Sequence, residues 1–297
     1  MNDEQRPAKA RTATIAHFGG VRERRFLALS SFAPTGPGYR RSRGAGLICQ
    51  VRFPVRFRER AEEGQTGCVR TIRDLDTVEL ILDAQGLLDS IRGPQRVVDA
   101  GTLRALQQSG NYVVGFFDGE GDEERMVGAS IAFFGEPARR AMHSHITALL
   151  PEYRGRGWGR ELKEHQRQWA FSRDVGRITW VFDPLVARNA HFFFSVLGAR
   201  ATGYSVNRYG IFGGGDAGDE SDRLDVEWAL ADIAKPPADD AVVETLEIPA
   251  DIEAMRESDP AAAHEWRLRL RAQMEGLLGS GLKVAGYDNA RGYLFTA

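Results

Sequence analysis

Hydrophobic and polar residues follow two different periods along the chain from Cys68 onward, and each period predicts one type of element. Residues 69–72 form a short β-rich run that predicts a strand. In residues 74–91 the apolar positions instead recur near one face of a helix, at Val78, Ile81, Leu82 and Leu88.

A predicted β-hairpin and a further strand come next. Residues 111–117 and 125–134 are strand-like runs, and the acidic, glycine-containing turn 118–124 joins them. Residues 140–150 predict a third strand, which leads into the glycine-rich segment 151–159.

The glycine-rich segment opens a helix that the pattern extends to about Asp174. Its apolar residues follow helical spacing, and Lys163 falls among its polar residues. The elements predicted after it are a strand at 177–182, a helix at 189–197 that Gly198 closes, a strand at 199–209, a loop at 213–223 and a strand at 224–230.

Beyond a proline-containing linker at 235–240, the segment 241–297 predicts strand, helix and strand. Asp259 can cap the helix, and Pro260 stands at the first helical position. Its apolar stripe comprises Ala263, Trp266, Leu270, Met274 and Leu277. Arg267 and Arg271 share one face, which predicts a solvated surface or, alternatively, a site for an anionic acceptor.

The pattern divides the chain into a basic leader at 1–66, a domain at 67–234 and an extension at 235–297 that packs on the domain. The leader holds 13 Lys and Arg against 6 Asp and Glu, a balance of +7, so the remaining residues carry −9 of the net −2. It mixes Pro, Gly and Arg without apolar periodicity, which predicts disorder. A nucleic-acid or membrane-binding arm, or an organellar targeting sequence, is the alternative.

The composition is that of a globular protein, with 42% hydrophobic and 27% charged residues among 297. No apolar run approaches the ~20 residues of a spanning helix. Cys49 and Cys68 cannot form a disulfide framework and lack metal-ligand spacing. We therefore expect no metal and a reducing cytoplasm.

The strongest candidate for chemistry is the turn at 154–160, whose sequence is Arg-Gly-Arg-Gly-Trp-Gly-Arg. Gly155, Gly157 and Gly159 let backbone N–H groups approach a ligand closely. These groups begin a helix, where unpaired donors and the macrodipole favour an anion such as a pyrophosphate. Arg154, Arg156 and Arg160 add positive charge. From spacing alone, a flexible turn with solvated arginines is the alternative.

These residues resemble the acyl-CoA pyrophosphate motif of the GNAT superfamily, Arg/Gln-x-x-Gly-x-Gly/Ala, here Arg154, Gly157 and Gly159. The order of elements over residues 68–230 is similar too. The segment 183–192 and the pair His143 and His145 resemble a largely uncharacterised bacterial subgroup of predicted GNAT acetyltransferases.

The resemblance implies an α/β (α+β) fold with a mixed, mostly antiparallel sheet that splays open between the strands at 140–150 and 177–182. Acetyl-CoA, or another acyl-CoA, would lie in that V as co-substrate. Backbone groups near Leu149 and Leu150 would pair with its arm, and backbone amides from Gly155 to Arg160, including that of Trp158, would hold its phosphates. Asn189 would either bond the arm or cap its helix.

His143 and His145 are the candidate bases. Residues i and i+2 of a strand share a face, so with Thr147 they would form a polar row leading to the turn. We favour His145, which is nearer the turn; a pair that only buttresses the sheet is the alternative.

The general acid is harder to assign. The family often places a tyrosine four residues before the helix-closing glycine, but Phe194 stands there, so Tyr204, Tyr209 or water would have to protonate the thiolate. Asp183 would orient a substrate ammonium or, preferably, cap the following helix, and the phenylalanines at 192–194 would belong to the core.

The sequence thus predicts a GNAT-type N-acetyltransferase that transfers an acyl group directly to a small amine or amino-acid-like metabolite. Neither nucleic acid nor a membrane is an expected partner, and the chain could form a homodimer. The alternatives are a catalytically inactive CoA-binding protein of the same fold and a GNAT-fold enzyme of other chemistry, such as acyl-CoA decarboxylation.

Overall fold

The structure, a computed structural model, describes residues 55–58, 69–92, 98–210 and 220–297. The chain divides at residue 50, and every described residue lies in the part 51–297. The predictions for Cys49, Cys68 and most of the leader and of the loop at 213–223 fall outside the described residues.

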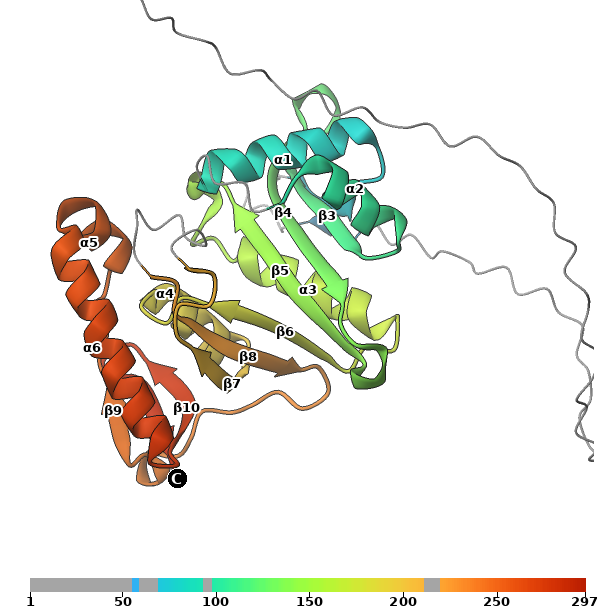
Figure 1. Cartoon of the computed structure of the whole chain (residues 1–297). Coiled ribbons are helices and arrows are strands. Elements are labelled where there is room, and N and C mark those ends of the chain that lie inside the picture. Colours follow the sequence, from blue (N-terminus) through green and yellow to red (C-terminus); the bar gives the residue numbers. More distant parts are fainter. Residues whose placement is uncertain (1–54, 59–68, 93–97, 211–219) are drawn as a thin grey trace, which may run out of the picture. The chain divides into compact units, whose positions relative to one another are not determined.

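One eight-stranded sheet forms the centre of this part (Figure 1), in the order β1-β2-β3-β4-β5-β6-β8-β7. All neighbouring strands pair antiparallel except β5 and β6, which are parallel. The mixed, mostly antiparallel sheet is therefore confirmed. The strands are β1 (Val55–Arg58), β2 (Val69–Asp74), β3 (Tyr112–Asp118), β4 (Arg125–Phe134), β5 (Ala141–Leu149), β6 (Arg177–Phe182), β7 (Arg200–Ser205) and β8 (Arg223–Ala229).

Strand β1 corrects the predicted boundary of the leader. Residues 55–58, which we assigned to it, pair with β2 in register from Val55 opposite Ile72 to Arg58 opposite Val69. The short run Val-Arg-Phe-Arg alternates apolar and basic residues, as an edge strand does, but its arginines resemble the rest of the leader.

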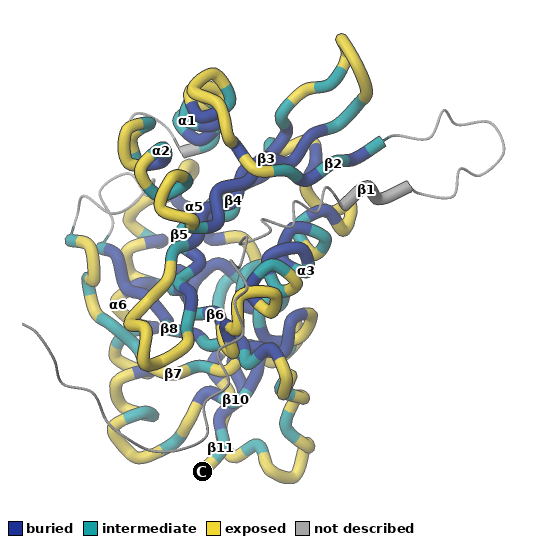
Figure 2. The backbone as a smooth tube through the Cα atoms, turned by 90° about the vertical axis from the view of Figure 1, so that its right-hand side faces the viewer, coloured by how far each residue is buried: buried dark blue, intermediate teal, exposed yellow. Residues whose placement is uncertain are grey.

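Helices cover both faces of the sheet, and buried residues lie between the layers (Figure 2). Most of these buried residues are apolar. On one face lie α1 (Val78–Arg92) and α2 (Ala100–Gln108), over a core that includes Ile131 and Ile146. On the other lie α3 (Trp158–Phe171) and α4 (Ala187–Ala190), which continues as the π-helical segment His191–Val196. The sequence pattern did not predict α2, although Asp99 caps it by accepting from the Thr102 N–H.

Strands β5 and β6 part almost at once. They pair only at Ala141, Met142 and His143, opposite Arg177, Ile178 and Thr179. Beyond His143, β5 keeps β4 on one side, and β6 keeps β8, but the two strands no longer pair with each other. The predicted splay between these strands is therefore present, and its apex lies at His143 and Thr179.

Strand β5 also contains a bulge. Ile131 pairs with Ile146 but Ala132 pairs with Ser144, so His145 is an extra residue on β5. The bulge exchanges the faces: Ser144 contacts α3, whereas Ile146 packs into the core beneath α1. This irregularity lies at the apex of the splay.

The C-terminal extension is richer than the predicted strand, helix and strand. It comprises β9 (Glu244–Leu246), α5 (Ile252–Ser258), α6 (Pro260–Gly279), β10 (Lys283–Asp288) and β11 (Gly292–Thr296), with the strands in the order β10-β11-β9. Asp259 caps α6 by accepting from the Ala262 N–H, and Pro260 opens the helix, as predicted. Tyr293 donates to the Pro184 carbonyl at 2.7 Å, which ties the extension to the end of β6.

Candidate acyl-CoA site

The glycine-rich turn lies at the amino end of α3, directly after β5. A single 3₁₀ turn at Pro151–Tyr153 follows the strand, and Gly155 and Gly157 then adopt φ values of 73° and 81°. A side chain is strained in this left-handed region, so the turn needs glycine at both positions. Gly157 stands at the N-cap of α3 but has no side chain to satisfy the first amides of the helix.

The backbone donors of this turn remain available. Within the described part of the chain, no backbone carbonyl accepts from the N–H groups of residues 155–159; the first bond of the helix runs from Arg160 N–H to the Gly157 oxygen. A Cβ placed on Gly155 or Gly157 would meet no atom within 4 Å. Several backbone donors without a backbone acceptor therefore lie beside open space, as an anion site at a helix N-terminus requires.

The arginines beside the turn are exposed. Arg154 donates through Nε to the Leu149 carbonyl at 3.2 Å, while no contact of Arg156 or Arg160 appears among the described residues. Two flexible cations thus stand beside the free amides. The side chain of Trp158, by contrast, is buried against Phe116, so Trp158 can serve a ligand only through its amide.

Buried contacts hold the beginning of α3 in place. Arg70 of β2 donates to the Glu161 carboxylate at 2.8 Å, and its guanidinium lies 4.5 Å from the centre of the Trp158 ring. Tyr153 donates to Asp118 at 3.0 Å and accepts from Arg125. The turn is therefore fixed to β2, β3 and β4, so its free amides have a set position.

The structure corrects the predicted partners for the cofactor arm. Both backbone groups of Leu150 are engaged, because its N–H donates to Val127 and its carbonyl accepts from Tyr153. Backbone groups of successive strand residues point to opposite edges. Since Leu150 points to β4, Leu149 and Thr147 point to the splayed edge. Leu149 therefore remains a candidate through its N–H, since its carbonyl accepts from Arg154, and Leu150 does not.

The predicted histidine pair lies at the apex of the splay. The rings of His143 and His145 have centroids 6.1 Å apart, and both contact Phe133 of β4. His143 Nδ1 lies 3.4 Å from the Thr179 hydroxyl across the last paired position. The two histidines do share a face, which is the face opposite α3, because His143 alternates with Ser144.

Thr147 does not continue this row. Its hydroxyl lies 2.9 Å from that of Ser130, which in turn accepts from Gln166 of α3. The bulge at His145 shifts the alternation, so Thr147 faces α3 while the histidines face the other side. The expectation of a three-residue polar row is therefore wrong beyond His145.

The pKa of His143 is lowered from 6.5 to about 4, mainly by burial and then by interaction with His145, Arg208 and Lys163, against the opposing effect of Asp225. His143 is therefore uncharged at neutral pH.

The matched family model fits this geometry. Residues 85–199, which run from α1 to the end of the π-helical segment, match the model described as the acetyltransferase (GNAT) family. Residues 85–199 thus match a GNAT acetyltransferase domain. GNAT acetyltransferases use acetyl-CoA or another acyl-CoA as acyl donor.

Solved structures of similar fold include three N-acetyltransferase or acetyltransferase proteins. The ribosomal-protein-S18-alanine N-acetyltransferase of Escherichia coli is 17% identical, covering 57% of this chain and 97% of its own, with a TM-score of 0.42. An IAA acetyltransferase of Bacillus cereus is 12% identical, covering 55% and 99%, with a TM-score of 0.40. The NatC complex bound to Gag peptide and CoA is 14% identical, covering 55% and 98%, with a TM-score of 0.45. No curated protein matches the sequence.

The GNAT domain places Asn189 in the third position of α4, after the N-cap Val186. The capping alternative for Asn189 is therefore wrong, and its partly exposed amide stays a candidate for the arm of the cofactor. Phe194 is buried against Phe182 and Tyr293, so its predicted place in the core is confirmed. Its own side chain supplies no hydroxyl.

The tyrosines proposed as acids differ in their surroundings. Tyr204 donates to the Asp222 carboxylate at 2.6 Å, and burial followed by this bond raises its pKa strongly, so it holds its proton. Tyr209 is 43% exposed on the turn after β7.

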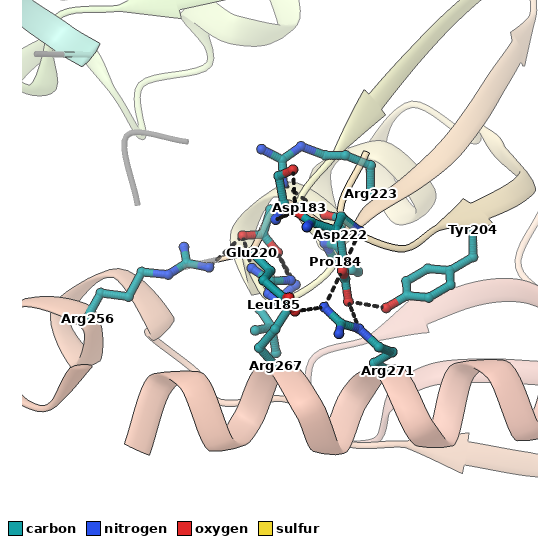
Figure 3. A network of polar contacts seen from close by, with 12 residues as sticks. Asp183, Pro184, Leu185, Tyr204, Glu220, Asp222, Arg223, Arg256, Arg267 and Arg271 are labelled. Carbon is teal, nitrogen blue, oxygen red and sulfur yellow. Dashed lines mark hydrogen bonds and ion pairs between the residues drawn. The ribbon is translucent and has the colours of Figure 1, made fainter. Parts of the chain in front are cut away.

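Asp183, at the end of β6, belongs to a buried ion network (Figure 3). Its carboxylate accepts from Arg267 at 2.8 and 2.7 Å, from Arg256 at 2.6 Å, and from the Leu185 N–H at 3.0 Å. Since α4 begins four residues later, Asp183 does not cap it, and the predicted capping role is wrong. Two arginines already bind the carboxylate that was to orient a substrate ammonium.

Arg267 and Arg271 are not a solvated face either. Arg267 is fully buried on Asp183, and Arg271 pairs with Asp222 at 2.7 Å and with Glu220. Carboxylates of the GNAT domain occupy both arginines, which leaves them no free charge for an anionic acceptor. The sequence could not reveal these pairs, because Arg267 is 84 residues from its partner.

Sequence reasoning also misplaced Lys163 of α3. It was assigned with the polar residues of the helix, yet it is only 4% exposed. Lys163, Gln166 and Ala170 follow helical spacing and are all buried, but the charge of Lys163 hid this in the sequence. Among the described residues, no helix has the length and apolar character to cross a membrane, and no His, Cys, Asp and Glu cluster could hold a metal.

Proposed function

We propose that this protein is an acyl-CoA-dependent N-acyltransferase that transfers an acyl group, preferably acetyl, directly to a small amine. The observation that carries the proposal is the row of unbonded amides at 155–159, which lies at the amino end of α3 beside a splayed sheet edge. These amides and the nearby Arg156 and Arg160 would hold the pyrophosphate. Leu149, Thr147 and Asn189 would bond the arm.

His145 is the proposed general base. It lies on the bulge at the apex of the splay, beside the uncharged His143. In this role it removes the proton of the acceptor amine as the new N–C bond forms. Histidine suits the task, because its ordinary pKa lies near neutrality.

The proposed acceptor is amino-acid-like. Arg208 and Asp225 form an ion pair at 2.6 Å, and both act electrostatically on His143. An ion pair therefore lies near His143, and it would have to open to engage a metabolite with both an amine and a carboxylate. Such metabolites are available in the cytoplasm, where we expect the enzyme to act.

A second candidate, a CoA-binding protein without turnover, draws its support from Phe194. The side chain is buried among aromatic rings, so it offers no proton donor to a leaving thiolate.

Incubation with acetyl-CoA and a panel of amines, followed by measurement of free thiol, separates the candidates. We expect thiol only when an amine is present. Thermal stabilisation by CoA with no thiol release would favour the binding protein, and release of CO₂ from malonyl-CoA would favour decarboxylation.

The base is tested on the same reaction. His145→Ala should lower kcat on the order of 10²-fold, because acid–base groups typically contribute that much. His264→Ala, an exposed histidine on α6, serves as the matched control and should leave kcat unchanged. Equal rates for both variants would remove His145 from the role.

A further inference from the structure

Lys163 lies at the point where β5 and β6 separate. Its Nζ donates to the Ser144 hydroxyl at 2.8 Å and lies 4.6 Å from the centre of the Trp180 ring. Ser144 and Trp180 each follow the last paired position, His143 opposite Thr179. The amine therefore reaches across the apex of the splay from the α3 side.

The surroundings of Lys163 are uncharged. Gln166 of the same helix accepts from Nζ at 3.1 Å, Ser144 comes from β5, and β6 contributes the indole of Trp180. His143 of β5 is the titratable neighbour on which Lys163 acts, and it is itself neutral. A buried lysine without a carboxylate at its amine is costly, so a core that keeps one invites a functional explanation.

A second buried donor lies nearby. The indole N–H of Trp180 is buried and has no hydrogen-bond acceptor among the described residues. Two donors, one of them ionisable, thus gather at the apex from the α3 side, whereas the histidines face the opposite side. A group that accepts a proton or hydrogen bond would complete this arrangement.

The splayed edge of β5 leads from the phosphate turn to this point. From Leu149 to Ser144 it extends about 17 Å at ~3.4 Å per residue. An extended arm whose phosphates bind at 155–159 would run along this edge, so its thioester end comes to the apex. The amine of the acceptor would then approach from the histidine side, and the sulfur would face α3.

We propose that Lys163 is the general acid of the reaction and gives its proton to the sulfur of the leaving CoA. This inference rests on the proposed function. As the acceptor nitrogen bonds to the acyl carbon, the C–S bond breaks and its electron pair stays on sulfur. The sulfur takes the Nζ proton, and His145 takes the proton that the acceptor nitrogen loses. Proton exchange with solvent then restores both residues.

The protonation behaviour of Lys163 supports this role. Burial lowers the pKa of its ammonium from 10.5 to about 7. Near neutral pH it can therefore both hold and release a proton, which a general acid must do. The residue also fills the role left open by Phe194 and by Tyr204, which holds its proton.

The decisive experiment follows the thiol of bound CoA and requires no acceptor. CoA is titrated with base while bound to the wild type, to Lys163→Met and to the control Lys283→Met, an exposed lysine on β10. Ultraviolet absorbance of the thiolate gives the pKa of the bound thiol. A nearby ammonium stabilises the thiolate, and the thiolate in turn keeps the ammonium protonated at higher pH, so we expect a lower thiol pKa in the wild type and the control than in Lys163→Met.

The outcomes separate the two proposals. If the wild type does not bind CoA, the proposed function fails and this inference fails with it. If all three proteins bind CoA and the thiol titrates alike, only the role of Lys163 is overturned. Lys163→Met should fold, because an apolar side chain of similar length replaces a buried amine that has no carboxylate beside it.

Turnover gives the second test. In the wild type kcat should fall as pH rises through about 7, because the ammonium is lost there. Lys163→Met should lower kcat about 10²-fold or more and lack this limb, whereas Lys163→Arg, always protonated, should lose the limb but keep more activity. An unchanged pH profile in Lys163→Met, or acylation of Lys163 itself detected by mass spectrometry, would overturn the inference.

Discussion

Two groups of arginines in this chain have opposite fates. Arg154, Arg156 and Arg160 surround the amino end of α3 and are exposed. Arg256, Arg267 and Arg271 of the extension lie under the GNAT domain and are bound by Asp183, Asp222 and Glu220. The exposed arginines can therefore interact with a bound anion. The charges of the buried arginines are already balanced by carboxylates within the fold.

The comparison shows that a cluster of cations is not a binding site by its composition. The exposed group accompanies backbone donors that have no acceptor, so an anion would complete it. The buried group already has its anions, and without them it would be a set of unpaired buried charges. We therefore propose that the glycine-rich turn is a binding site and that the buried ion network around Asp183 holds the extension on the rest of the fold.

The largest expected effect concerns this buried ion network. Asp183→Ala leaves Arg256 and Arg267 buried without their carboxylate, so the free energy of unfolding should fall by about 3–5 kcal/mol. Urea denaturation measures it. The matched control is Asp232→Ala, which removes the exposed partner of Arg200 and should cost at most about 1 kcal/mol. Equal losses would show that the buried network does not fasten the extension.

The next effect concerns the turn. Gly157→Glu places a carboxylate in the open space before the amides, so CoA affinity should fall at least about 100-fold, or about 2.7 kcal/mol. Gly281→Glu is the matched control, because Gly281 also has positive φ and open space but lies in the extension. Calorimetric titration with CoA compares them. Normal binding by Gly157→Glu would move the phosphates elsewhere.

Acid should weaken the buried ion network around Asp183 before it affects the glycine-rich turn. Burial alone would raise the pKa of Asp183, but Arg267 and Arg256 outweigh it and lower the pKa to about 2. The carboxylate therefore contributes stability above its unfolded pKa of about 3.9, and this contribution, about 2 kcal/mol, is lost as pH falls towards 2. Unfolding followed between pH 5 and 2 should show this loss in the wild type and not in a folded Asp183→Asn variant.

The smallest effect should come from single exposed arginines. Arg156→Gln removes one solvated charge beside the free amides, so CoA affinity should fall only several-fold and less at high salt. Calorimetry at low and high salt checks this. A loss as large as that of Gly157→Glu would mean that the arginine, rather than the backbone, holds the phosphates.

Local patterns predicted most of the strands and the turn. The strand bounds 125–134 and 177–182 agree with β4 and β6, because period-two alternation and flanking turn residues mark them directly. The turn was found because glycine spacing reports backbone conformation, and Gly155 and Gly157 indeed have positive φ.

Features that depend on distant or irregular packing escaped prediction. The bulge at His145 follows no residue pattern, so simple alternation put Thr147 on the wrong face. The burial of Lys163 was hidden by its charge, and the pairing of Asp183 with Arg267 joins positions 84 residues apart. Sequence periodicity reports which residues face a core, but not which charges meet there.

The backbone amides of residues 155–159 provide the most direct test of the account. Their ¹H–¹⁵N resonances are followed while CoA, and separately pantetheine, which lacks the phosphates, is added to the protein. We predict that CoA shifts these amides downfield, as hydrogen bonds to phosphate oxygens form, and that pantetheine does not. Unchanged resonances in protein saturated with CoA would contradict the account.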